Sequence, residues 1–356
     1  MRKILFCSLF FFCISLSAHA DKDIIKFLRT IKKAEFCGES YPLGNEIVRE
    51  RLEKEVLLSL WDKAQVFLWL KRSSRYFPVI EKLLVSAGLP DDLKYISVIE
   101  SALRFDARSG KGAAGFWQFI PATAKLYGLT VNNLVDERRD IERSTTAAIE
   151  YLSDLYKKFG TWKLALAAYN LGEIRIQKDL KSQKEKDYFS LWLPEETMRY
   201  LYKAFAVKFV FENRGKLGFY LKKADYYRPF DLKKILIHFD GTCPASLLSS
   251  VAGVSYHNFK IYNPWLIGDF FTKGKFQISL PLKKSRKKLL KKFKLEYLAW
   301  KKAHDEVTYI VKPGDSLIKI SEEMGVRVKD VMEWNRLGYK NYIYPGQSLL
   351  IRTSKN

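Results

Sequence analysis

The stretch PDDLKYISVIESAL at positions 90–103 indicates the fold of this chain most clearly. The proline and two aspartates at its start favour a helix N-terminus. Apolar side chains then return every three to four positions, at Leu93, Ile96, Ile99 and Leu103. Glu100 lies among them, with apolar neighbours four positions before it and three after it. Such a carboxylate either pairs with a cation in a structural role, which is the commoner case, or has its pKa raised toward neutrality, as a general acid needs.

Helical periodicity extends from this stretch in both directions, from Asn45 to about Gly215. Glycines stand where the pattern breaks, at Gly88 and Gly160, and Thr161 is placed to cap the helix that follows it. The expected helices include one long helix through 56–68 and others over 76–87, 141–159 and 162–170. This part of the chain is therefore predicted to be an all-helical domain.

After Tyr226 the period changes, and the segment 234–239 alternates in the manner of a strand. Two later segments resemble each other without gaps, namely 253–263 and 325–335. At the same offset the strand falls on 307–311, so strand, helix, helix and strand recur in one order. The sequence thus predicts a mainly α protein in which a helical domain is followed by two small βααβ modules.

The first twenty residues have the form of a secretory signal. Basic Arg2-Lys3 precedes an apolar run over 4–16, and Ala18-His19-Ala20 precedes Asp21. The run is too short for a comfortable membrane span of roughly 20 residues. We expect secretion across the inner membrane into the periplasm or cell envelope. The formal net charge of +23 favours anionic surfaces, and export leaves nucleic acid as the weakest of these partners.

Cysteine and histidine usage excludes several chemistries. Beyond the signal only Cys37 and Cys243 remain, and they could form one disulfide or stay free. The remaining histidines all lie in the last third of the chain, at His238, His257 and His304. A Ser-His-Asp triad, a Cys-His pair or a histidine-bound zinc is therefore excluded from the helical part. We expect neither a metal nor a cofactor.

Two further stretches supply groups that suit a sugar. SGKGAAGFWQFIP at 109–121 surrounds one amide, Gln118, with aromatic and apolar residues, and its glycines permit a tight backbone course. AAYNLG at 167–172 ends a run of small residues with Tyr169 and Asn170. Aromatic walls that pack on pyranose faces, together with directional hydrogen bonds, are typical of sugar sites. The structural alternative is a buried Tyr169 hydroxyl and a helix cap at Asn170.

The ordered motifs resemble a known family. Glu100-Ser101, the Gly115-to-Gln118 block and Ala168-Tyr169-Asn170 with Gly172 resemble the three motifs of the soluble-type lytic transglycosylase domain, whose fold is related to goose-type lysozyme. The match covers roughly 78–178. The Trp-Gln-Phe-x-Pro form and the C-terminal modules are most similar to the membrane-bound lytic murein transglycosylase D group. The resemblance therefore implies a lysozyme-like fold for the helical domain.

Residue roles follow from the same resemblance. It implies that Glu100 is the catalytic acid/base. The implied substrate-binding residues are Ser101, Ser109, Gln118, Tyr169 and Asn170. The sequence departs from the family pattern where Arg104-Phe105 replaces Asn-Pro, Ile120 replaces Met and Ile174 replaces a frequent Gly. These changes bear on the shape of the groove, and none removes a group that transfers a proton.

The implied reaction is non-hydrolytic cleavage of the bond between N-acetylmuramic acid and N-acetylglucosamine in peptidoglycan, which leaves a 1,6-anhydro end. Ordinary glycosidases use two carboxylates, whereas the motif region offers one obvious candidate. One rival is a hydrolytic muramidase of the same fold, which would need a second carboxylate such as Asp106. Another is an inactive peptidoglycan-binding scaffold, against which the intact Glu100, Gln118 and Tyr169 argue.

The segment 308–352 resembles the LysM module, which binds polymers that contain N-acetylglucosamine. Its implied glycan-binding residues are Gly314, Asp315, Ser316, Leu317 and Tyr344. The earlier copy, 226–282, has Thr242-Cys243-Pro244 where the later one has Gly314-Asp315-Ser316. We therefore expect the earlier copy to be a degenerate LysM-like module.

A dense basic segment separates the two modules. The predicted order is a signal over 1–20, the helical domain over 21–225, the first module, a basic linker or helix over 283–307, and the second module. Within 283–302 the apolar residues recur at helical spacing. One interpretation is a solvated helix with its apolar side on a neighbouring module, and the other is electrostatic contact with the anionic envelope surface. The oligomeric state stays open.

Overall fold

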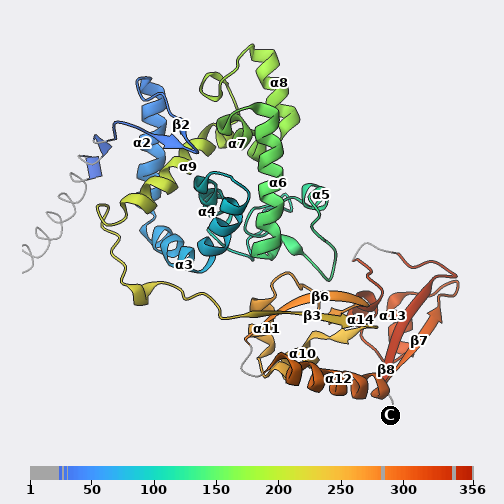
Figure 1. Cartoon of the computed structure of the whole chain (residues 1–356). Coiled ribbons are helices and arrows are strands. Elements are labelled where there is room, and N and C mark those ends of the chain that lie inside the picture. The colour runs from blue at the N-terminus through green and yellow to red at the C-terminus, as the bar shows by residue number, and fades with distance from the viewer. Residues whose placement is uncertain (1–23, 26–27, 30, 282–284, 339–341, 355–356) are drawn as a thin grey trace, which may run out of the picture. The chain divides into compact units, whose positions relative to one another are not determined.

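The computed structural model describes residues 24–25, 28–29, 31–281, 285–338 and 342–354. The predicted signal over 1–20 lies outside these residues. The contacts divide the chain into two compact units. The first contains the residues up to Leu103 together with Ala148–Tyr227, and the second contains Arg104–Ala147 together with the residues from Arg228 onward. Figure 1 shows that helices dominate the first and that the strands β3, β6, β7 and β8 belong to the second.

The first unit is built around one buried helix. This helix, α9 (Glu195–Asn213), buries eleven of its residues and packs against α2, α4 and α7. The other helices of the unit are α2 (Glu46–Trp61), α3 (Lys63–Ser86), α4 (Lys94–Ser101), the later part of α6 (Ile141–Phe159), α7 (Trp162–Leu171) and α8 (Glu173–Gln183). The short elements are the hairpin β1 (Glu35–Phe36) and β2 (Glu39–Ser40) and the 3-10 turns η1 (Asp91–Leu93), η3 (Tyr188–Ser190) and η4 (Lys223–Asp225). The prediction of a mainly helical first part is confirmed.

The predicted long helix through 56–68 is wrong, because the chain breaks at Asp62. The Asp62 side chain accepts a hydrogen bond from the Gln65 N–H at 2.9 Å and so caps the start of α3. The predicted start at Tyr76 is also wrong, since α3 begins at Lys63 and continues through Pro78. An interior proline removes one helical hydrogen bond, and the burial of Phe77 and Ile80 beside it offsets that loss.

Helix α4 carries Glu100 and ends one residue after it. Ala102 and Leu103 both have left-handed backbone angles, with φ of 53° and 59°, and the Ala102 N–H closes the last turn on the Val98 carbonyl at 2.8 Å. Arg72 also donates to the Ala102 carbonyl, at 3.0 Å. The prediction that Leu103 continues the helix face of Glu100 is therefore wrong, although its side chain is buried. The tertiary contacts stop this helix where the apolar period would have continued it.

The second unit contains the two βααβ modules that the repeat predicts. The first consists of β3 (Lys233–Phe239), α10 (Ala245–Ala252), α11 (Tyr256–Tyr262) and β6 (Gly274–Leu280), with the short pair β4 (Cys243–Pro244) and β5 (Phe270–Phe271). The second consists of β7 (His304–Ile310), α13 (Leu317–Glu323), α14 (Val328–Trp334) and β8 (Ser348–Ser354). In each module the two long strands pair antiparallel, with Ile235 opposite Ile278 and Val307 opposite Ile351.

One repeated asparagine has the same role in both modules. The Asn263 side chain accepts from the Ser279 N–H at 2.8 Å and donates to its carbonyl at 3.0 Å. In the second module the Asn335 side chain makes the same two bonds to Leu350, at 2.6 and 2.8 Å. Each asparagine thus ties the second helix to the closing strand. The ungapped similarity of the two segments reflects a shared structural device.

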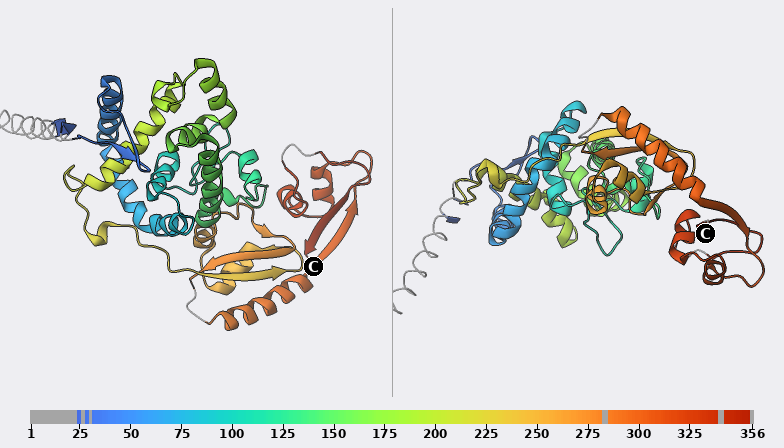
Figure 2. Two further views of the ribbon diagram at one scale, coloured as in Figure 1. Left: turned by 45° about the horizontal axis from the view of Figure 1, so that its top comes forward. Right: turned by 90° about the horizontal axis from the view of Figure 1, so that it is seen from below.

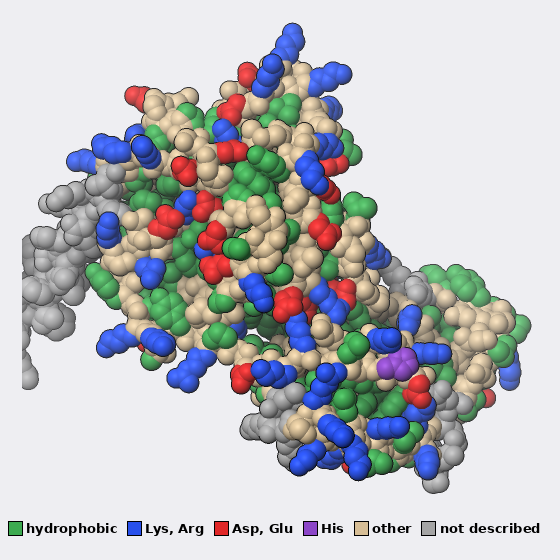
Figure 3. All heavy atoms as spheres, viewed as in Figure 1, with side chains coloured by type: hydrophobic (Ala, Val, Ile, Leu, Met, Phe, Trp, Pro, Cys, Tyr) green, Lys and Arg blue, Asp and Glu red, His purple; other side chains and the backbone are tan. Residues whose placement is uncertain are grey.

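Helix α12 (Arg286–Ala303) contains most of the basic segment. Its buried residues Leu289, Phe293 and Tyr297 join the core of the first module, so its apolar side packs on a neighbouring module as the first interpretation predicts. Figure 2 shows α12 as a long helix that leads from the first module into β7. Figure 3 shows lysine and arginine side chains gathered on the surface of these modules.

The rest of the second unit precedes the modules in sequence. It contains α5 (Pro121–Leu126), η2 (Glu137–Arg139) and the start of α6. The Asp136 N–H donates to the Trp265 carbonyl at 2.7 Å, and the Leu134 carbonyl accepts from Ile267 and Gly268. Cys37 and Cys243 are both buried free thiols. Among the described residues, no helix is long and apolar enough to cross a bilayer.

Candidate active site

Glu100 lies near the end of α4, and its carboxylate is held by a tyrosine. The Tyr200 hydroxyl, from α9, donates a hydrogen bond to Oε1 of Glu100. Burial raises the pKa of Glu100 to about 7, against the lowering effect of the Tyr200 hydrogen bond, while Glu196 raises it and Lys203 lowers it. The side chain still reaches the surface in part. Glu100 is thus able to exist in both protonation states near neutral pH, as an acid/base requires.

Tyr169 joins Glu100 and Tyr200 in one cluster. Burial and the negative charge of Glu100 raise the pKa of both tyrosines well above their usual range. Tyr151 from α6 stands against Tyr169, with ring centroids 5.3 Å apart. Both phenols therefore stay protonated, as neutral hydrogen-bond donors beside the carboxylate. The structure brings the predicted pair Glu100 and Tyr169 together and adds Tyr200.

Helix α7 is positioned by a distant carboxylate. Glu39 in β2 accepts hydrogen bonds from the backbone N–H groups of Trp162 and Lys163 at 2.5 and 3.1 Å, and the Thr161 side chain caps the Leu164 N–H. These bonds satisfy the open N–H groups at the start of the helix. At its other end Tyr169 reaches the cluster around Glu100. The hairpin β1–β2 therefore helps to fix a site residue that is far away in sequence.

Two of the predicted substrate-binding residues, Asn170 and Ser101, form side-chain hydrogen bonds within the first unit. The Asn170 side-chain oxygen accepts from the Thr197 hydroxyl at 2.7 Å, which ties α7 to α9. Ser101 is buried, and its hydroxyl donates to the Ser97 carbonyl at 3.0 Å. Both bonds hold the helices that carry Glu100, Tyr169 and Tyr200. The described contacts favour positioning roles for Asn170 and Ser101.

Ser109 and Gln118 lie on the glycine-rich loop of the second unit. The Ser109 side chain accepts from the Ala113 N–H at 3.1 Å. Gln118 has a left-handed φ of 49°, and its amide nitrogen donates to the carbonyls of Ala107 and Gly115 at 3.2 and 2.9 Å. The residue is partly exposed. The loop thus holds Gln118 in one orientation.

A buried ion pair supports this loop from behind. Arg138 pairs with Asp136 at 2.7 and 2.9 Å and donates to the carbonyls of Gly112 and Phe119 at 2.8 and 2.9 Å. A Cβ at Gly115 would lie 1.9 Å from the Arg138 carbonyl oxygen, and φ there is +78°. Only glycine fits that position without moving the backbone. The Gly115 motif position therefore reflects close packing of two backbone segments.

Sequence reasoning missed Tyr200, Asp136 and Arg138. Tyr200 shares the apolar period of α9 with residues such as Leu201 and Ala204, so the pattern alone marks it as core. Asp136 and Arg138 stand in a charged run that resembles a solvated turn, yet they are 1% and 3% exposed. Their roles depend on contacts with residues far along the chain, which local periodicity does not report.

Asp106, the alternative second carboxylate, is engaged by a neighbour. Both of its oxygens accept from Arg104, each at 3.1 Å. The hydrogen bond from Arg104 lowers the pKa of Asp106. Its charge is therefore stabilised, which weakens it as a base for activating water.

The predicted glycan-binding residues of the second module surround the start of α13 and one loop. Asp315 accepts from the Tyr309 hydroxyl and the Lys312 N–H, each at 2.8 Å, and Ser316 caps the Lys319 N–H at 3.2 Å. Gly314 adopts a φ of 82°, and Leu317 packs on the small core. Tyr344 is 65% exposed. Asp315 and Ser316 thus shape the loop, and Tyr344 presents its ring to solvent.

Two family models match the chain, one over the region of the candidate site and one over the second module. Residues 78–191 match the family model of the transglycosylase SLT domain, and residues 309–352 match that of the LysM domain. The first match contains Glu100, Gln118 and Tyr169, and the second covers most of the second βααβ module. The resemblance inferred from the motifs is confirmed.

Similar proteins show which transglycosylase family the chain belongs to. The chain is 31% identical over 333 residues to the membrane-bound lytic murein transglycosylase D of Escherichia coli (strain K12), with 89% of this chain and 72% of that protein covered. It is 33% identical over 132 residues to the peptidoglycan transglycosylase gp16 of Escherichia phage T7, which covers 36% of this chain and 10% of that protein. The solved 70 kDa soluble lytic transglycosylase of Escherichia coli overlaps 50% of this chain and 33% of its own, at 18% identity and a TM-score of 0.35. The chain belongs to the family of the membrane-bound lytic murein transglycosylase D.

Proposed function

We propose that this protein is a peptidoglycan lytic transglycosylase that cleaves the β-1,4 bond between N-acetylmuramic acid and N-acetylglucosamine without water. The observation that carries the proposal is Glu100, a carboxyl group with a pKa of about 7 that is hydrogen-bonded to a neutral Tyr200. One group with this pKa is able to give a proton and take one back at the same pH. Membership of the lytic murein transglycosylase family supports the same reaction.

In the first step, protonated Glu100 gives its proton to the oxygen of the glycosidic bond. The bond from this oxygen to the muramoyl C1 breaks, and N-acetylglucosamine leaves with the proton as its O4 hydroxyl. The substrate's own acetamido group stabilises the positive charge at C1. Tyr200 donates to the carboxylate that forms, which lowers the cost of its charge.

In the second step the Glu100 carboxylate takes the proton of the muramoyl C6 hydroxyl. The O6 oxygen then bonds to C1 and closes the 1,6-anhydro ring, so Glu100 returns to its acid form. Tyr169, Gln118 and Ser109 are proposed to bind the sugar, as the resemblance of the motifs implies. Ser101 and Asn170 are proposed to hold the helices of the site.

Product analysis tests this function against hydrolysis. Muropeptides released from sacculi should end in 1,6-anhydro-muramic acid, each one water lighter than the hydrolytic product, and a chelator should not slow their release. Mass spectrometry after digestion in labelled water separates the outcomes. Dominant reducing ends that carry the label would make the enzyme a muramidase, with Asp106 the first base to test, and an absence of products on embedded murein would favour an inactive scaffold.

We further propose that the protein acts in the periplasm after removal of residues 1–20, and that the catalytic domain over 21–225 is delivered to glycan by the module at 308–352. The exposed ring of Tyr344 supports glycan binding by that module, and the basic face of α12 supports contact with the anionic envelope surface. A tethered module raises the local substrate concentration. Deletion of 308–356 should weaken binding to sacculi and spare cleavage of short soluble glycans, whereas equal losses on both would contradict a delivery role.

A further inference from the structure

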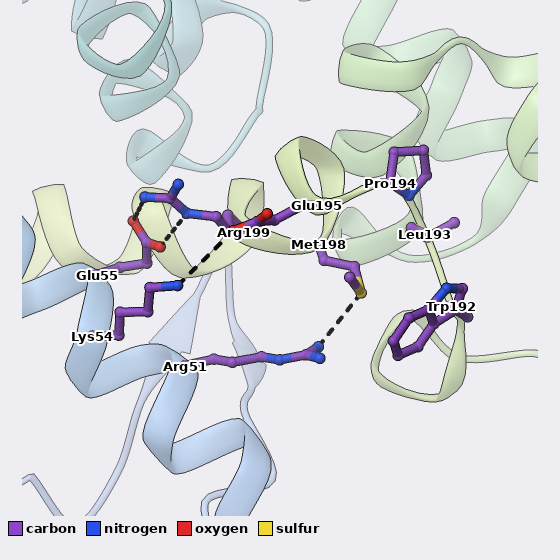
Figure 4. A pocket seen from close by; sticks show the side chains of 9 residues that line it. All are labelled: Arg51, Lys54, Glu55, Trp192, Leu193, Pro194, Glu195, Met198 and Arg199. Carbon is purple, nitrogen blue, oxygen red and sulfur yellow. Dashed lines mark hydrogen bonds and ion pairs between the residues drawn. The ribbon is translucent and has the colours of Figure 1, made fainter.

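A cavity of about 490 Å³ lies in the first unit between α2 and the segment that leads into α9. This volume is within the roughly 300–1,000 Å³ typical of small-ligand sites. We name it the α2–α9 pocket, and Figure 4 shows it from close by. Its lining residues are Arg51, Lys54, Glu55, Trp192, Leu193, Pro194, Glu195, Met198 and Arg199.

Trp192 forms an aromatic wall whose backbone is fixed. Its flanking residues Leu191 and Leu193 are buried, and the Gln183 side chain accepts from the Trp192 N–H at 2.7 Å and donates to its carbonyl at 2.9 Å. The indole is nevertheless 76% exposed. An exposed ring on an anchored backbone is a preorganised surface for an apolar group, since little order is lost when a ligand stacks on it.

Three cations approach the pocket, and they differ in their partners. Arg199 is engaged by Glu55 at 2.6 and 3.2 Å, and Lys54 stands 3.9 Å from Glu195. Arg51 extends from α2 toward Met198 (Figure 4), with its Nη1 3.6 Å from the sulfur. A thioether is a weak acceptor. A side-chain hydrogen bond from Arg51 to Tyr202 acts against the burial that raises the pKa of that tyrosine. Within the described part of the chain no carboxylate forms an ion pair with Arg51, and a guanidinium has five N–H donors, so it retains donors for an anionic ligand.

The pocket is distinct from the cluster around Glu100. Met198 and Arg199 face the pocket, whereas Glu196, Tyr200 and Lys203 act on Glu100. The residues that line the pocket therefore do not include those that act on Glu100, although Arg199 lies one turn before Lys203 on α9. A ligand in the pocket would contact the helix that carries Tyr200 and leave the carboxylate of Glu100 uncovered.

We propose that the α2–α9 pocket binds a free carboxylate of the peptidoglycan stem peptide, with Arg51 as its partner and Trp192 against the adjacent apolar part of the peptide. This inference rests on the proposed function for the identity of the substrate. In intact peptidoglycan the lactyl carboxyl of muramic acid is used in the amide bond to the peptide, so the free carboxylates belong to the peptide. A guanidinium binds a carboxylate through two parallel hydrogen bonds.

The test is a binding titration of the full mature protein with the tetrapeptide L-Ala-γ-D-Glu-meso-diaminopimelate-D-Ala. Arg51→Ala should weaken binding about tenfold, as expected for loss of a charge-assisted pair, and Arg51→Lys should fall between the two. Trp192→Ala should weaken binding as well, and its exposed position makes misfolding a minor concern. The matched control is Arg49→Ala, which removes the same charge from α2 at a residue that pairs with Glu53.

Equal losses in Arg51→Ala and Arg49→Ala would overturn the proposal, because they would reveal a general charge effect. So would a peptide with amidated carboxyls that binds as tightly as the free one, or the absence of binding to the wild type. A GlcNAc-MurNAc disaccharide with a free lactyl carboxylate should not compete, and strong competition would assign the pocket to the sugar acid. Peptide binding is measured separately from cleavage. If the protein bound the peptide but released hydrolytic products, the proposed reaction would be rejected and the proposal that the pocket binds the stem peptide would be retained.

Discussion

Two glutamates meet consecutive residues of α9 and are held in opposite ways. Glu55 on α2 is 3% exposed and accepts two hydrogen bonds from Arg199. Glu100 on α4 accepts from the neutral Tyr200, and burial raises its pKa to about 7. A full cation beside a carboxylate favours its charge, whereas a phenol compensates burial only in part. The comparison teaches that the partner, more than burial itself, decides whether a buried glutamate forms a structural ion pair or can be protonated near neutral pH.

The same substitution at the two glutamates sharpens this comparison. Glu100→Gln should retain the fold and lower turnover on sacculi by about 10²–10⁴, because the amide keeps the shape and lacks the transferable proton. Turnover and a thermal melt of the same sample provide the measurement. Retention of a tenth or more of wild-type turnover would exclude Glu100 as the sole acid/base.

Glu55→Gln should show its main effect in stability. The change removes the carboxylate that accepts hydrogen bonds from Arg199, and since that arginine is one-third exposed, the unfolding free energy should fall by about 1–3 kcal/mol. Urea titration measures this fall. A loss of turnover, at a temperature where the variant is folded, as large as that of Glu100→Gln would break the comparison.

The raised pKa of Glu100 also predicts how stability depends on pH. Below pH 4.5 the carboxyl is protonated in both folded and unfolded chains, and between 4.5 and about 7 it ionises in the unfolded chain alone. Wild-type stability should therefore fall across this window relative to Glu100→Gln, by about 1–2 kcal/mol after allowance for partial exposure. Denaturant titrations of both proteins at pH 4 and pH 8 give this difference, and parallel pH dependences would contradict the assignment.

Of the four predicted effects, that of Tyr200→Phe should be the smallest. The Tyr200 hydrogen bond lowers the pKa of Glu100, so its removal should raise that pKa further and move the pH profile of turnover to higher pH, with a modest loss of maximum rate. Profiles recorded over pH 5–9 on one substrate test the sign. A shift to lower pH would mean that Tyr200 acts on another group.

Several residues of the candidate site were predicted from residue order alone. The apolar period around Glu100, the glycines before Gln118 and the small residues before Tyr169 carry local signatures, and the repeat that contains Asn263 and Asn335 predicted both modules. Helix ends were less readable. The apolar period continues across Asp62, yet the chain breaks there and Asp62 caps the next helix. Likewise α4 ends at Ala102, although the apolar period continues to Leu103. Caps and tertiary contacts compete with periodicity at such points.

The sequence by itself determined the helical class of the first part, the two βααβ modules and the family. Each of these depends on spacing along the chain, which local periodicity and motif order record. Only the tertiary structure decided that Tyr200 holds Glu100, that Arg138 supports the Gln118 loop and that Arg51 and Trp192 share a cavity. These pairs are distant in sequence, and their meeting depends on how α9 packs against α2 and α4 and on how the loop packs on η2, which no local pattern encodes.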